Sequence, residues 1–299
     1  MRRTIVFISL LCAACGHLGG GADPVTSDPE TIDRDHPAAL MGTSIESGGA
    51  QMNGIVYMAA GPGPHPTVIL LHGYPGEERN LDLAQAIRRS GRNVLFFHYR
   101  GAWGSEGEYG IANAIEDVEA AIAFAASPAF AEAHRADPAR IALVGHSMGG
   151  FLALAAGSEQ SAVSCIGSIA GANLGRMAVA DTATADAAAR RLDAMSGPIR
   201  GNPGARLVAE IAENALAFDT TRRAPRLATK SLLLVAGTRD RVTPPEVHHD
   251  PLEAALVAAG ARRLRVARLD ADHAFSPRRV ALARNVVDWL DESCDGPPQ

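Results

Sequence analysis

Hydrophobic positions along the chain form short uninterrupted runs that alternate with longer segments of helical spacing. Apolar runs of about 4–8 residues are typical of strands buried on both faces of a sheet, whereas apolar residues three or four apart are typical of helices. Strands are predicted at 54–58, 67–71, 93–98, 140–144, 162–170, 231–236 and 264–269, and helices at 80–90, 111–126, 148–156, 245–259 and 276–290. This alternation predicts an α/β fold with a mostly parallel central sheet and helices on both faces.

One long segment, residues 171–230, interrupts this alternation. It contains alanine-rich helical stretches but no clear strand, and proline and glycine residues between Gly197 and Gly204 divide it. An insertion of this kind at one end of a parallel sheet is typical of a cap over a site, with a packing appendage as the alternative. We therefore expect one main domain over about 41–292, with a helical cap insertion at about 171–230.

The first forty residues differ in composition from the rest. Arg2 and Arg3 precede an uncharged apolar run, which is the pattern of a secretory signal peptide over residues 1–14. Residues 15–40 are rich in Gly, Asp and Pro, which predicts a flexible tether. The expected location is therefore outside the cytoplasm.

The residues before Cys15 resemble a bacterial lipobox, because small side chains at Ala13 and Ala14 precede the cysteine. This resemblance makes Cys15 the candidate lipid-attachment residue and implies a periplasmic, membrane-anchored lipoprotein. Cys12 stands where a lipobox usually has leucine. Ordinary cleavage near Ala14, with release of a soluble secreted protein, is the alternative.

The composition excludes several classes of protein. A hydrophobic content of 47% over 299 residues is ample for a core and excludes general disorder. A net charge of −5, no long Lys/Arg block and 5% aromatic residues argue against a nucleic-acid partner. After the N-terminal run, no apolar stretch reaches the roughly 18 residues of a membrane-spanning helix. Four cysteines are too few for a disulfide scaffold, although a Cys165–Cys294 pair is allowed in an oxidising compartment.

A G-x-S-x-G element centred on Ser147 joins the strand predicted at 140–144 to the helix predicted at 148–156. In the sharp turn that this position requires, a side chain at Gly145 or Gly149 would collide with neighbouring backbone. The turn also directs the N-terminus of the helix at the reacting oxygen. The element is typical of a nucleophile elbow, which makes Ser147 the candidate nucleophile. The alternative is a glycine-rich helix start with Ser147 as its N-cap.

Together with two further motifs, this element makes the chain resemble the α/β-hydrolase superfamily over about 41–290. The sequence HGYPG at 72–76 follows a predicted strand, as the oxyanion loop of that family does, and YRGAWGSEG at 99–107 resembles the family's RGxGxSxG loop. This pairing is similar to bacterial esterases, dienelactone hydrolases and prolyl-oligopeptidase-like members. The resemblance implies the α/β-hydrolase fold, with 171–230 as its cap.

Acyl transfer builds negative charge on the substrate oxygen, so such a site needs preorganised hydrogen-bond donors. One donor is expected to be the backbone N–H of Met148, which follows the nucleophile, and the second comes from the loop at 72–76. Pro75 has no N–H to donate. By resemblance, the second oxyanion donor is Tyr74.

A serine hydroxyl is a poor nucleophile at neutral pH, so Ser147 needs a base. His273 lies in the loop after the last predicted strand, where the resemblance places the base. The other histidines are interpreted as surface or structural residues: His248 and His249 as surface residues at a helix start, and His72 and His146 as structural residues beside the motifs.

The base needs a carboxylate that fixes its tautomer and stabilises the imidazolium. Asp240 follows the strand predicted at 231–236, where the resemblance places the acid, and completes the superfamily order of serine, aspartate and histidine. Asp270 and Asp272 are the rivals. Asp272 directly precedes His273, and adjacent side chains in a loop seldom meet in the geometry of a triad.

The sequence contains no Walker loop, no G-x-G-x-x-G after a strand and no Cys/His cluster at zinc spacing, so no cofactor and no metal site are expected. The interpretation is an exported serine hydrolase that forms an acyl-enzyme, with a small-molecule ester or short acyl compound as substrate. A serine peptidase of prolyl-oligopeptidase or aminopeptidase type is the first alternative. A non-catalytic binding protein on a hydrolase scaffold is the second.

Overall fold

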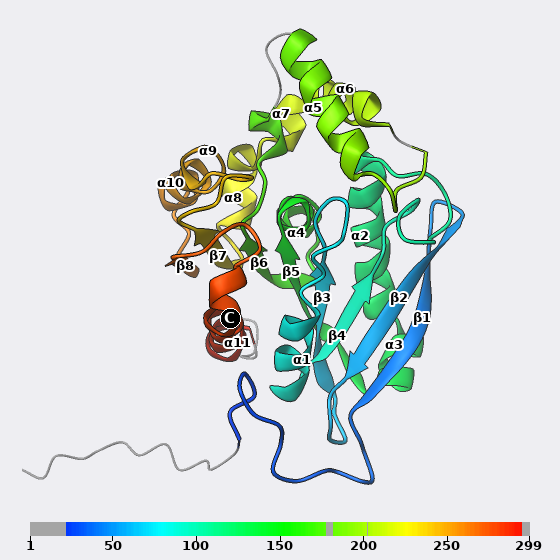
Figure 1. Cartoon of the computed structure of the whole chain (residues 1–299). Helices are drawn as coiled ribbons and strands as arrows, with labels where there is room; N and C mark the ends of the chain where they lie inside the picture. Colours follow the sequence, from blue (N-terminus) through cyan, green and yellow to red (C-terminus); the bar gives the residue numbers. More distant parts are fainter. Residues whose placement is uncertain (1–21, 178–181, 202, 295–299) are drawn as a thin grey trace, which may run out of the picture.

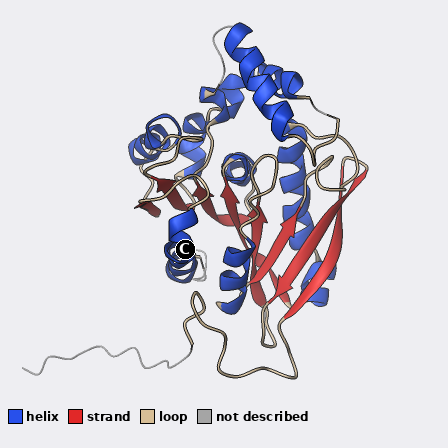
Figure 2. Ribbon diagram, in the orientation of Figure 1, coloured by secondary structure: helices blue, strands red, loops and turns tan. Residues whose placement is uncertain are grey.

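The computed structural model describes residues 22–177, 182–201 and 203–294, so the predicted signal peptide and Cys15 lie outside the described residues. An eight-stranded sheet forms the centre of the molecule, in the order β1-β2-β4-β3-β5-β6-β7-β8 (Figures 1 and 2). β1 and β2 are antiparallel to their neighbours, and the strands from β4 to β8 are parallel. The strands are β1 (Ala39–Ser47), β2 (Ala50–Met58), β3 (His65–Leu71), β4 (Asn93–Phe97), β5 (Ala136–His146), β6 (Val163–Ile169), β7 (Ser231–Gly237) and β8 (Leu264–Leu269).

Helices cover both faces of this sheet (Figure 2). One face packs against α1 (Leu81–Arg89) and α11 (Arg279–Ser293), and the other against α2 (Ile111–Ala125), α4 (Met148–Glu159) and α10 (Asp250–Ala258). Two short helices, α3 (Pro128–His134) and α9 (Pro245–His248), complete the main domain. The predicted α/β class, with its mostly parallel sheet, is confirmed.

The central strand β3 shows why the apolar runs in the sequence predict strands. Successive side chains of a strand point to opposite faces. Val68 and Leu70 therefore join the core beneath α1 and α11, while Ile69 and Leu71 join the core beneath α2 and α4. Because both faces are covered, the strand is apolar at every one of these positions.

The segment between β6 and β7 forms a helical layer over one end of the sheet, at the top of Figure 1. Its helices are α5 (Thr182–Met195), α6 (Gly204–Glu213), α7 (Ala215–Phe218) and α8 (Ala224–Leu227). Gly204 permits close packing within this cap, because a Cβ there would lie 2.1 Å from the carbonyl oxygen of Ala189.

The cap is attached to the main domain through polar contacts. The Glu210 carboxylate accepts hydrogen bonds from the N–H groups of Ile111 and Ala112, at 3.0 and 2.7 Å. These N–H groups belong to the first turn of α2 and have no acceptor within that helix, so an acidic side chain stabilises them well. The backbone of the cap also contacts the loop after β4, where Trp103 N–H donates to Pro198 at 2.9 Å.

A disulfide joins β6 to the C-terminal end of α11. It links Cys165 and Cys294, whose Cα atoms are 5.9 Å apart and which are separated by 129 positions in the sequence. The sequence allowed this pair without requiring it. A covalent link across so many residues restricts the unfolded chain and thereby stabilises the folded one.

We expect Cys294→Ser to lower the free energy of unfolding by about 2–4 kcal/mol, because the variant loses this restriction on the unfolded chain. Denaturant unfolding followed by tryptophan fluorescence measures the change. Reduction of the wild-type protein should reproduce it, whereas reductant should leave the variant unaffected. Equal unfolding midpoints for the oxidised wild type and Cys294→Ser would contradict a stabilising role.

Within the predicted tether of residues 15–40, residues 22–38 contain no helix or strand, but β1 begins at Ala39. The first described residues contact the main domain. Val25 is buried in the core beneath α1 and α11. Asp23 pairs with Arg284, and Arg89 donates to the carbonyl oxygen of Pro24 at 2.7 Å. A freely moving tether would therefore have to end before these contacts.

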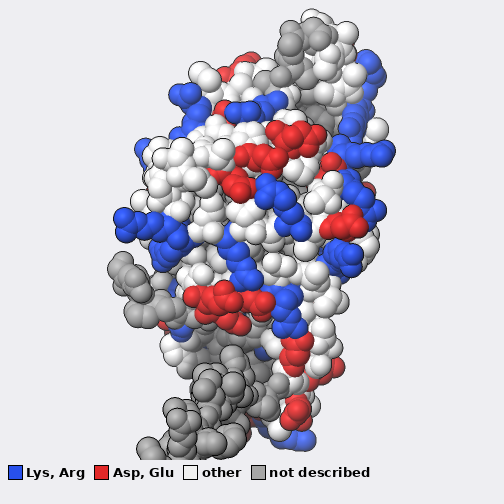
Figure 3. All heavy atoms as spheres, turned by 90° about the vertical axis from the view of Figure 1, so that its left-hand side faces the viewer, with Lys and Arg blue, Asp and Glu red and all other residues white. Residues whose placement is uncertain are grey.

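The charged surface carries both signs. Figure 3 shows the face at the left of Figure 1, where basic and acidic side chains are interspersed. β8 lies at this edge, and its Arg265 and Arg268 pair with Glu292 and Glu253 at 3.1 and 2.7 Å. Among the described residues, no helix combines the length and the apolar character needed to cross a membrane.

Candidate active site

Ser147 lies at the sharp turn between β5 and α4, at the carboxyl end of the parallel strands. Its φ of 58° and ψ of −119° are rare for a residue with a side chain, so the surrounding structure holds the turn in a strained conformation. A Cβ on Gly145 would lie 2.0 Å from the carbonyl oxygen of Gly149, and a Cβ on Gly149 would lie 2.3 Å from that of Leu71. The glycines at both ends of the motif are therefore required, as the sequence predicted.

Asp240 and His273 lie in the loops after β7 and β8 and meet in a hydrogen bond. His273 Nδ1 lies 2.7 Å from Asp240 Oδ2, and Asp240 is buried while the imidazole remains partly exposed. An ionised carboxylate only accepts hydrogen bonds, so Nδ1 carries the proton and Nε2 is left free to accept one. This is the tautomer that a catalytic base requires.

The Asp240 carboxylate is held from its own loop. The N–H groups of Val242 and Thr243 donate to Oδ1 at 2.8 and 2.9 Å, and the Thr243 hydroxyl lies 2.8 Å from Oδ2. Burial alone raises the pKa of Asp240, but the hydrogen bonds from His273 and Thr243 outweigh it and lower this pKa to about 2. Asp240 is therefore an anion at neutral pH, fixed beside the imidazole.

The two rival carboxylates do not reach His273 in this way. Asp272 is exposed, and its Oδ1 accepts the N–H of Ser276 at 2.8 Å. Asp270 pairs with Arg239 at 2.6 Å on the surface. Of the three candidate acids, the structure brings Asp240 to the histidine.

The candidate oxyanion donors flank Ser147. Met148 begins α4, so its N–H belongs to the first helical turn and has no acceptor within the helix. The loop after β3 runs directly against the serine, since a Cβ on Gly73 would lie 2.9 Å from Ser147 Cβ and 3.4 Å from Ser147 Oγ. Tyr74 follows in this loop, and its backbone N–H has no acceptor among the described residues. Two free backbone donors thus lie on chain segments next to the nucleophile.

Buried His72 and half-buried His98 form a chain of hydrogen bonds that ends on the peptide group carrying the Tyr74 N–H. His72 Nδ1 donates to the carbonyl oxygen of Gly73 at 2.7 Å, and this carbonyl belongs to the same peptide group. Because Nδ1 carries the proton, Nε2 of His72 accepts, and His98 Nδ1 donates to it at 3.2 Å. The indole of Trp103 stacks on His98 and donates to the carbonyl oxygen of Pro75 at 2.8 Å. The loop is therefore held from both of its ends.

His146, the variable residue of the motif, contacts the loop of the candidate base. Its Nε2 donates to the carbonyl oxygen of His273 at 2.8 Å, and the two rings lie 4.7 Å apart. From the sequence, His72 and His146 are interpreted as structural residues. The structure shows that each supports a loop of the candidate site.

Burial also gives these histidines a pH-dependent effect on stability. Desolvation lowers the pKa of His72 and His146 to about 4 and that of His98 to about 3. Between about pH 6.5 and pH 4 the unfolded chain therefore binds more protons than the folded one, so the free energy of unfolding falls as the pH falls. Burial also lowers the pKa of His134, His248 and His249, which act in the same direction. Asp117, whose pKa burial raises, acts in the opposite direction.

We expect His72, His98 and His146 each to contribute up to about 1.4 kcal/mol of this loss per pH unit. Denaturant unfolding at pH 8.0, 6.5, 5.5 and 4.5 tests the expectation. The free energy of unfolding should begin to fall above pH 5. In that range Asp240 is ionised in both the folded and the unfolded chain, so its low pKa contributes nothing. A stability profile that is flat from pH 6.5 to 4.5 would contradict neutral buried histidines.

His248 and His249 correct one sequence expectation. They were predicted at the surface, but both are buried, at 5% and 8% exposure. The short helix α9 turns His248 toward the start of the cap segment, where its Nδ1 accepts the Asn173 N–H at 3.0 Å. A helix start had suggested exposure, but the cap covers this position.

One group of candidate metal ligands occurs among the described residues. The donor atoms of His249, Asp250 and Glu253 lie within 4.8 Å of one another. Arg268 Nη2 already donates to both carboxylates, at 2.8 and 2.7 Å. The guanidinium thus provides the positive charge that a metal ion would bring.

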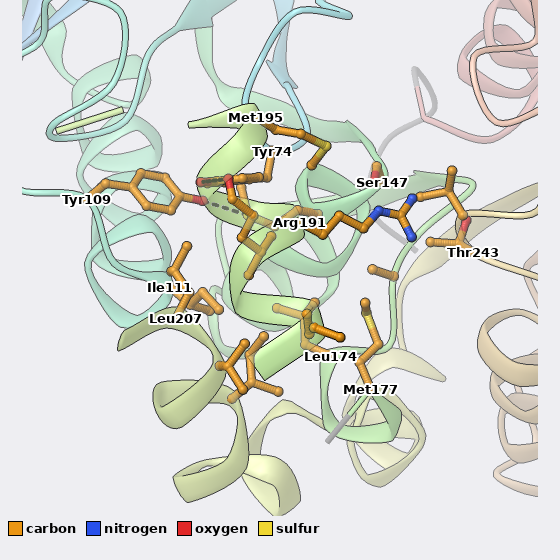
Figure 4. Close-up of a pocket in the computed structure, with 18 of the residues that line it drawn as sticks. Tyr74, Tyr109, Ile111, Ser147, Leu174, Met177, Arg191, Met195, Leu207 and Thr243 are labelled. Carbon is orange, nitrogen blue, oxygen red and sulfur yellow. Dashed lines mark hydrogen bonds between the residues drawn. The ribbon is translucent and has the colours of Figure 1, made fainter. Parts of the chain in front are cut away.

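A cavity of about 420 Å³ opens beside Ser147, between the main domain and the cap (Figure 4). Its wall is mostly apolar, and Figure 4 shows side chains from α5 and α6 facing those of the main domain. The lining residues include Tyr74, Tyr109, Ile111, Leu174, Met177, Arg191, Leu192, Met195, Leu207 and Thr243. The cap therefore forms part of the wall of the pocket that contains the candidate nucleophile.

Thr243 is a site residue that sequence reasoning missed. It lies three positions after Asp240 in the same loop, and its hydroxyl also lies 3.2 Å from His273 Nδ1. His98 was missed as well, because nothing local in the sequence links it to His72. The threonine could have been found, since a hydroxyl and an N–H that follow an aspartate commonly hydrogen-bond to it.

The comparison with protein families decides the identification. Residues 68–284 match the sequence model described as the Alpha/beta hydrolase family. The chain belongs to the alpha/beta hydrolase family. A search of curated protein sequences found no match.

Several solved structures of other proteins have a similar fold. The chain is similar to the esterase Pf2001 of Pyrococcus furiosus, with a TM-score of 0.61 and 18% identity over 86% of this chain and 93% of the other. It is similar to Est1E of Butyrivibrio proteoclasticus, determined with ferulic acid bound, with a TM-score of 0.64 and 16% identity over 84% and 98%. An acylaminoacyl peptidase of Pyrococcus horikoshii matches with a TM-score of 0.63 and 15% identity, over 87% of this chain and 42% of the other. At these identities the likeness shows the alpha/beta hydrolase fold.

Proposed function

We propose that this alpha/beta hydrolase is a serine hydrolase that cleaves carboxylic esters of small molecules through an acyl-enzyme. One observation carries the proposal. Ser147 is held in a strained turn that opens into an apolar cavity, and the hydrogen-bonded pair of Asp240 and His273 lies on the neighbouring loops at the same edge of the sheet. A merely structural serine needs neither the strain nor the cavity.

In the proposed mechanism, Ser147 Oγ attacks the ester carbonyl while His273 Nε2 takes the hydroxyl proton. His273 then donates this proton to the alcohol oxygen as the bond between carbonyl carbon and alcohol oxygen breaks, leaving an acyl group on Ser147. A water molecule, deprotonated by the same imidazole, cleaves the acyl-enzyme. Asp240 remains ionised and stabilises the imidazolium in both steps.

The N–H groups of Tyr74 and Met148 are proposed to bind the oxyanion of each tetrahedral intermediate. Preorganised donors stabilise this charge better than water because they need no reorientation during the reaction. His72 supports this role, because its hydrogen bond to the Gly73 carbonyl fixes and polarises the peptide group that carries the Tyr74 N–H.

The character of the cavity favours esters over peptides. An enzyme that recognises the amino group at the end of a peptide needs an acidic side chain in its pocket. Among the described residues that line this cavity none is acidic, and the one charged side chain is Arg191. A peptidase is the second candidate function, because the chain is similar to the Pyrococcus horikoshii acylaminoacyl peptidase. The absence of an acidic side chain among the described lining residues gives it less support.

A panel of p-nitrophenyl esters of increasing acyl length, measured beside aminoacyl p-nitroanilides, tests the proposal. We expect hydrolysis of several esters and much lower kcat/KM values for the anilides. Faster cleavage of the anilides would favour the peptidase. The absence of turnover with every compound, together with no labelling by a fluorophosphonate, would favour a binding protein on a hydrolase scaffold.

We also propose that the protein is exported and anchored through a lipid on Cys15. The apolar run before Cys15 and the small residues beside it support the proposal. The Cys165–Cys294 disulfide adds support, because disulfides persist in oxidising compartments. The wild-type protein should incorporate labelled palmitate and fractionate with membranes, whereas Cys15→Ser should stay unlabelled. An unlabelled wild type would overturn the lipid, and a mature protein that retains residues 1–14 would overturn export.

A further inference from the structure

The cavity beside Ser147 presents one cation in an otherwise apolar wall. The described residues that line it are aliphatic, aromatic, sulfur-containing or hydroxylic, with Arg191 as the exception. Arg191 lies on α5 of the cap, one position before Leu192 and four before Met195, which also line the cavity. An apolar wall selects an apolar ligand body. Arg191, which is also exposed to solvent, is the one charged residue among the described residues of this wall.

Among the described residues, the guanidinium of Arg191 makes no hydrogen bond and no ion pair. Some other arginines of the cap segment have partners. Arg223, for example, lies 3.0 Å from the Glu159 carboxylate, and Arg206 donates to the Gly201 carbonyl at 3.0 Å. Figure 4 shows the Arg191 side chain crossing the cavity, with its guanidinium directed toward Ser147 and Thr243.

Two acids among the described residues, Asp193 and Asp240, have hydrogen-bond partners other than Arg191. Asp193, two positions along α5, accepts the N–H of Gly204 at 2.5 Å. Asp240, behind Thr243, accepts hydrogen bonds from its own loop and from His273. The charge of Arg191 is therefore available to a ligand that enters the cavity.

We propose that the substrates are esters that carry a free carboxylate, such as monoesters of dicarboxylic acids, and that Arg191 binds this carboxylate while Ser147 attacks the ester. The inference rests on the proposed hydrolase function and specifies its substrate class. A guanidinium binds a carboxylate through two parallel hydrogen bonds and balances its single charge. A phosphate dianion would leave a second charge unpaired against the apolar wall, which is unfavourable. The apolar wall accommodates the methylene chain between the two groups.

The experiment compares two substrates that differ only at the charged end. Monoethyl adipate carries the carboxylate, and its carboxamide analogue is neutral and of equal size. The release of ethanol measures the hydrolysis of both substrates. We expect wild-type kcat/KM to be about tenfold or more higher for the carboxylate, since hydrogen bonds between charged groups are the strong ones. In Arg191→Gln the ratio should fall to about one, and in Arg191→Glu below one. Adipate should inhibit the wild type competitively, with a Ki that Arg191→Gln raises about tenfold.

Arg190→Gln is the matched control. Arg190 is the neighbouring arginine on the same helix and is exposed like Arg191, but it does not line the cavity, so its variant should retain the wild-type ratio. A wild-type ratio near one, or a preference that survives Arg191→Gln, would overturn the inference while ester hydrolysis stands. If an ester that carries a phosphonate in place of the free carboxylate is hydrolysed with a higher kcat/KM, the choice of a carboxylate as the bound anion is overturned. If the wild-type protein neither hydrolyses any ester nor reacts with a fluorophosphonate probe, the proposed function itself is overturned.

Discussion

Ser147→Ala is expected to lower kcat for the best ester about 10⁴-fold or more. The variant removes the oxygen that forms the acyl-enzyme, and no neighbouring group can replace it. The main-chain geometry of the turn depends on Gly145 and Gly149 rather than on the hydroxyl, so the fold should persist. The residual rate should reflect substrate binding and the oxyanion donors alone. Steady-state ester hydrolysis, with circular dichroism to check the fold, measures the effect.

The control for this prediction is Ser105→Ala, which removes a hydroxyl outside the cavity. Ser105 accepts the N–H of Asn53 and donates to the carbonyl of His98, at 3.0 and 2.9 Å. Its loss should therefore affect stability more than kcat. A Ser147→Ala protein that is folded and retains more than about a tenth of wild-type kcat would rule out Ser147 as the nucleophile.

Asp240→Asn is expected to cost about 10⁴-fold in kcat, nearly as much as the loss of the nucleophile. The amide keeps the shape of the side chain but removes the charge that stabilises the imidazolium. Its NH₂ group can also donate to His273 Nδ1, which would move the imidazole proton to Nε2, where the base must accept. Because the shape is kept, the melting temperature should change far less than kcat. The ester assay and thermal unfolding measure the two effects separately.

Asp272→Asn provides the comparison, because this rival lies directly beside His273 in sequence. Its carboxylate is exposed and accepts the N–H of Ser276, so its substitution should change kcat less than about threefold. If Asp272→Asn proves more damaging than Asp240→Asn, the assignment of the acid is wrong. Equal and small effects would indicate that His273 works without a carboxylate partner.

The central strands could be predicted from the sequence because they are buried on both faces. β7 has hydrophobic side chains at five of its seven positions and is fully buried, so its composition indicates a strand covered on both faces. β1 was not predicted, because it lies at the sheet edge and most of its residues are exposed or half-buried. Its hairpin with β2 turns at Gly48 and Gly49, both with positive φ, which is a local signal that the sequence did carry.

The candidate site could be predicted only as far as each residue has a signal in its own segment. Ser147 has its glycines, and Asp240 and His273 follow predicted strands whose ends meet at one edge of a parallel sheet. The hydrogen bond between His98 and His72 joins loops after two different strands, and no periodicity within either loop reports it. The charge of Arg191 inside the cavity depends on how the cap folds back over the sheet, which a local pattern cannot show.

The central claim is that Ser147 is an activated nucleophile, and covalent labelling tests it most directly. The wild-type protein is treated with a fluorophosphonate at neutral pH, digested and sequenced by mass spectrometry. We expect one phosphonate per chain, on the peptide that contains Ser147, with labelling slowed strongly in His273→Ala. An unmodified Ser147, or an adduct that forms on a different serine, would contradict the account.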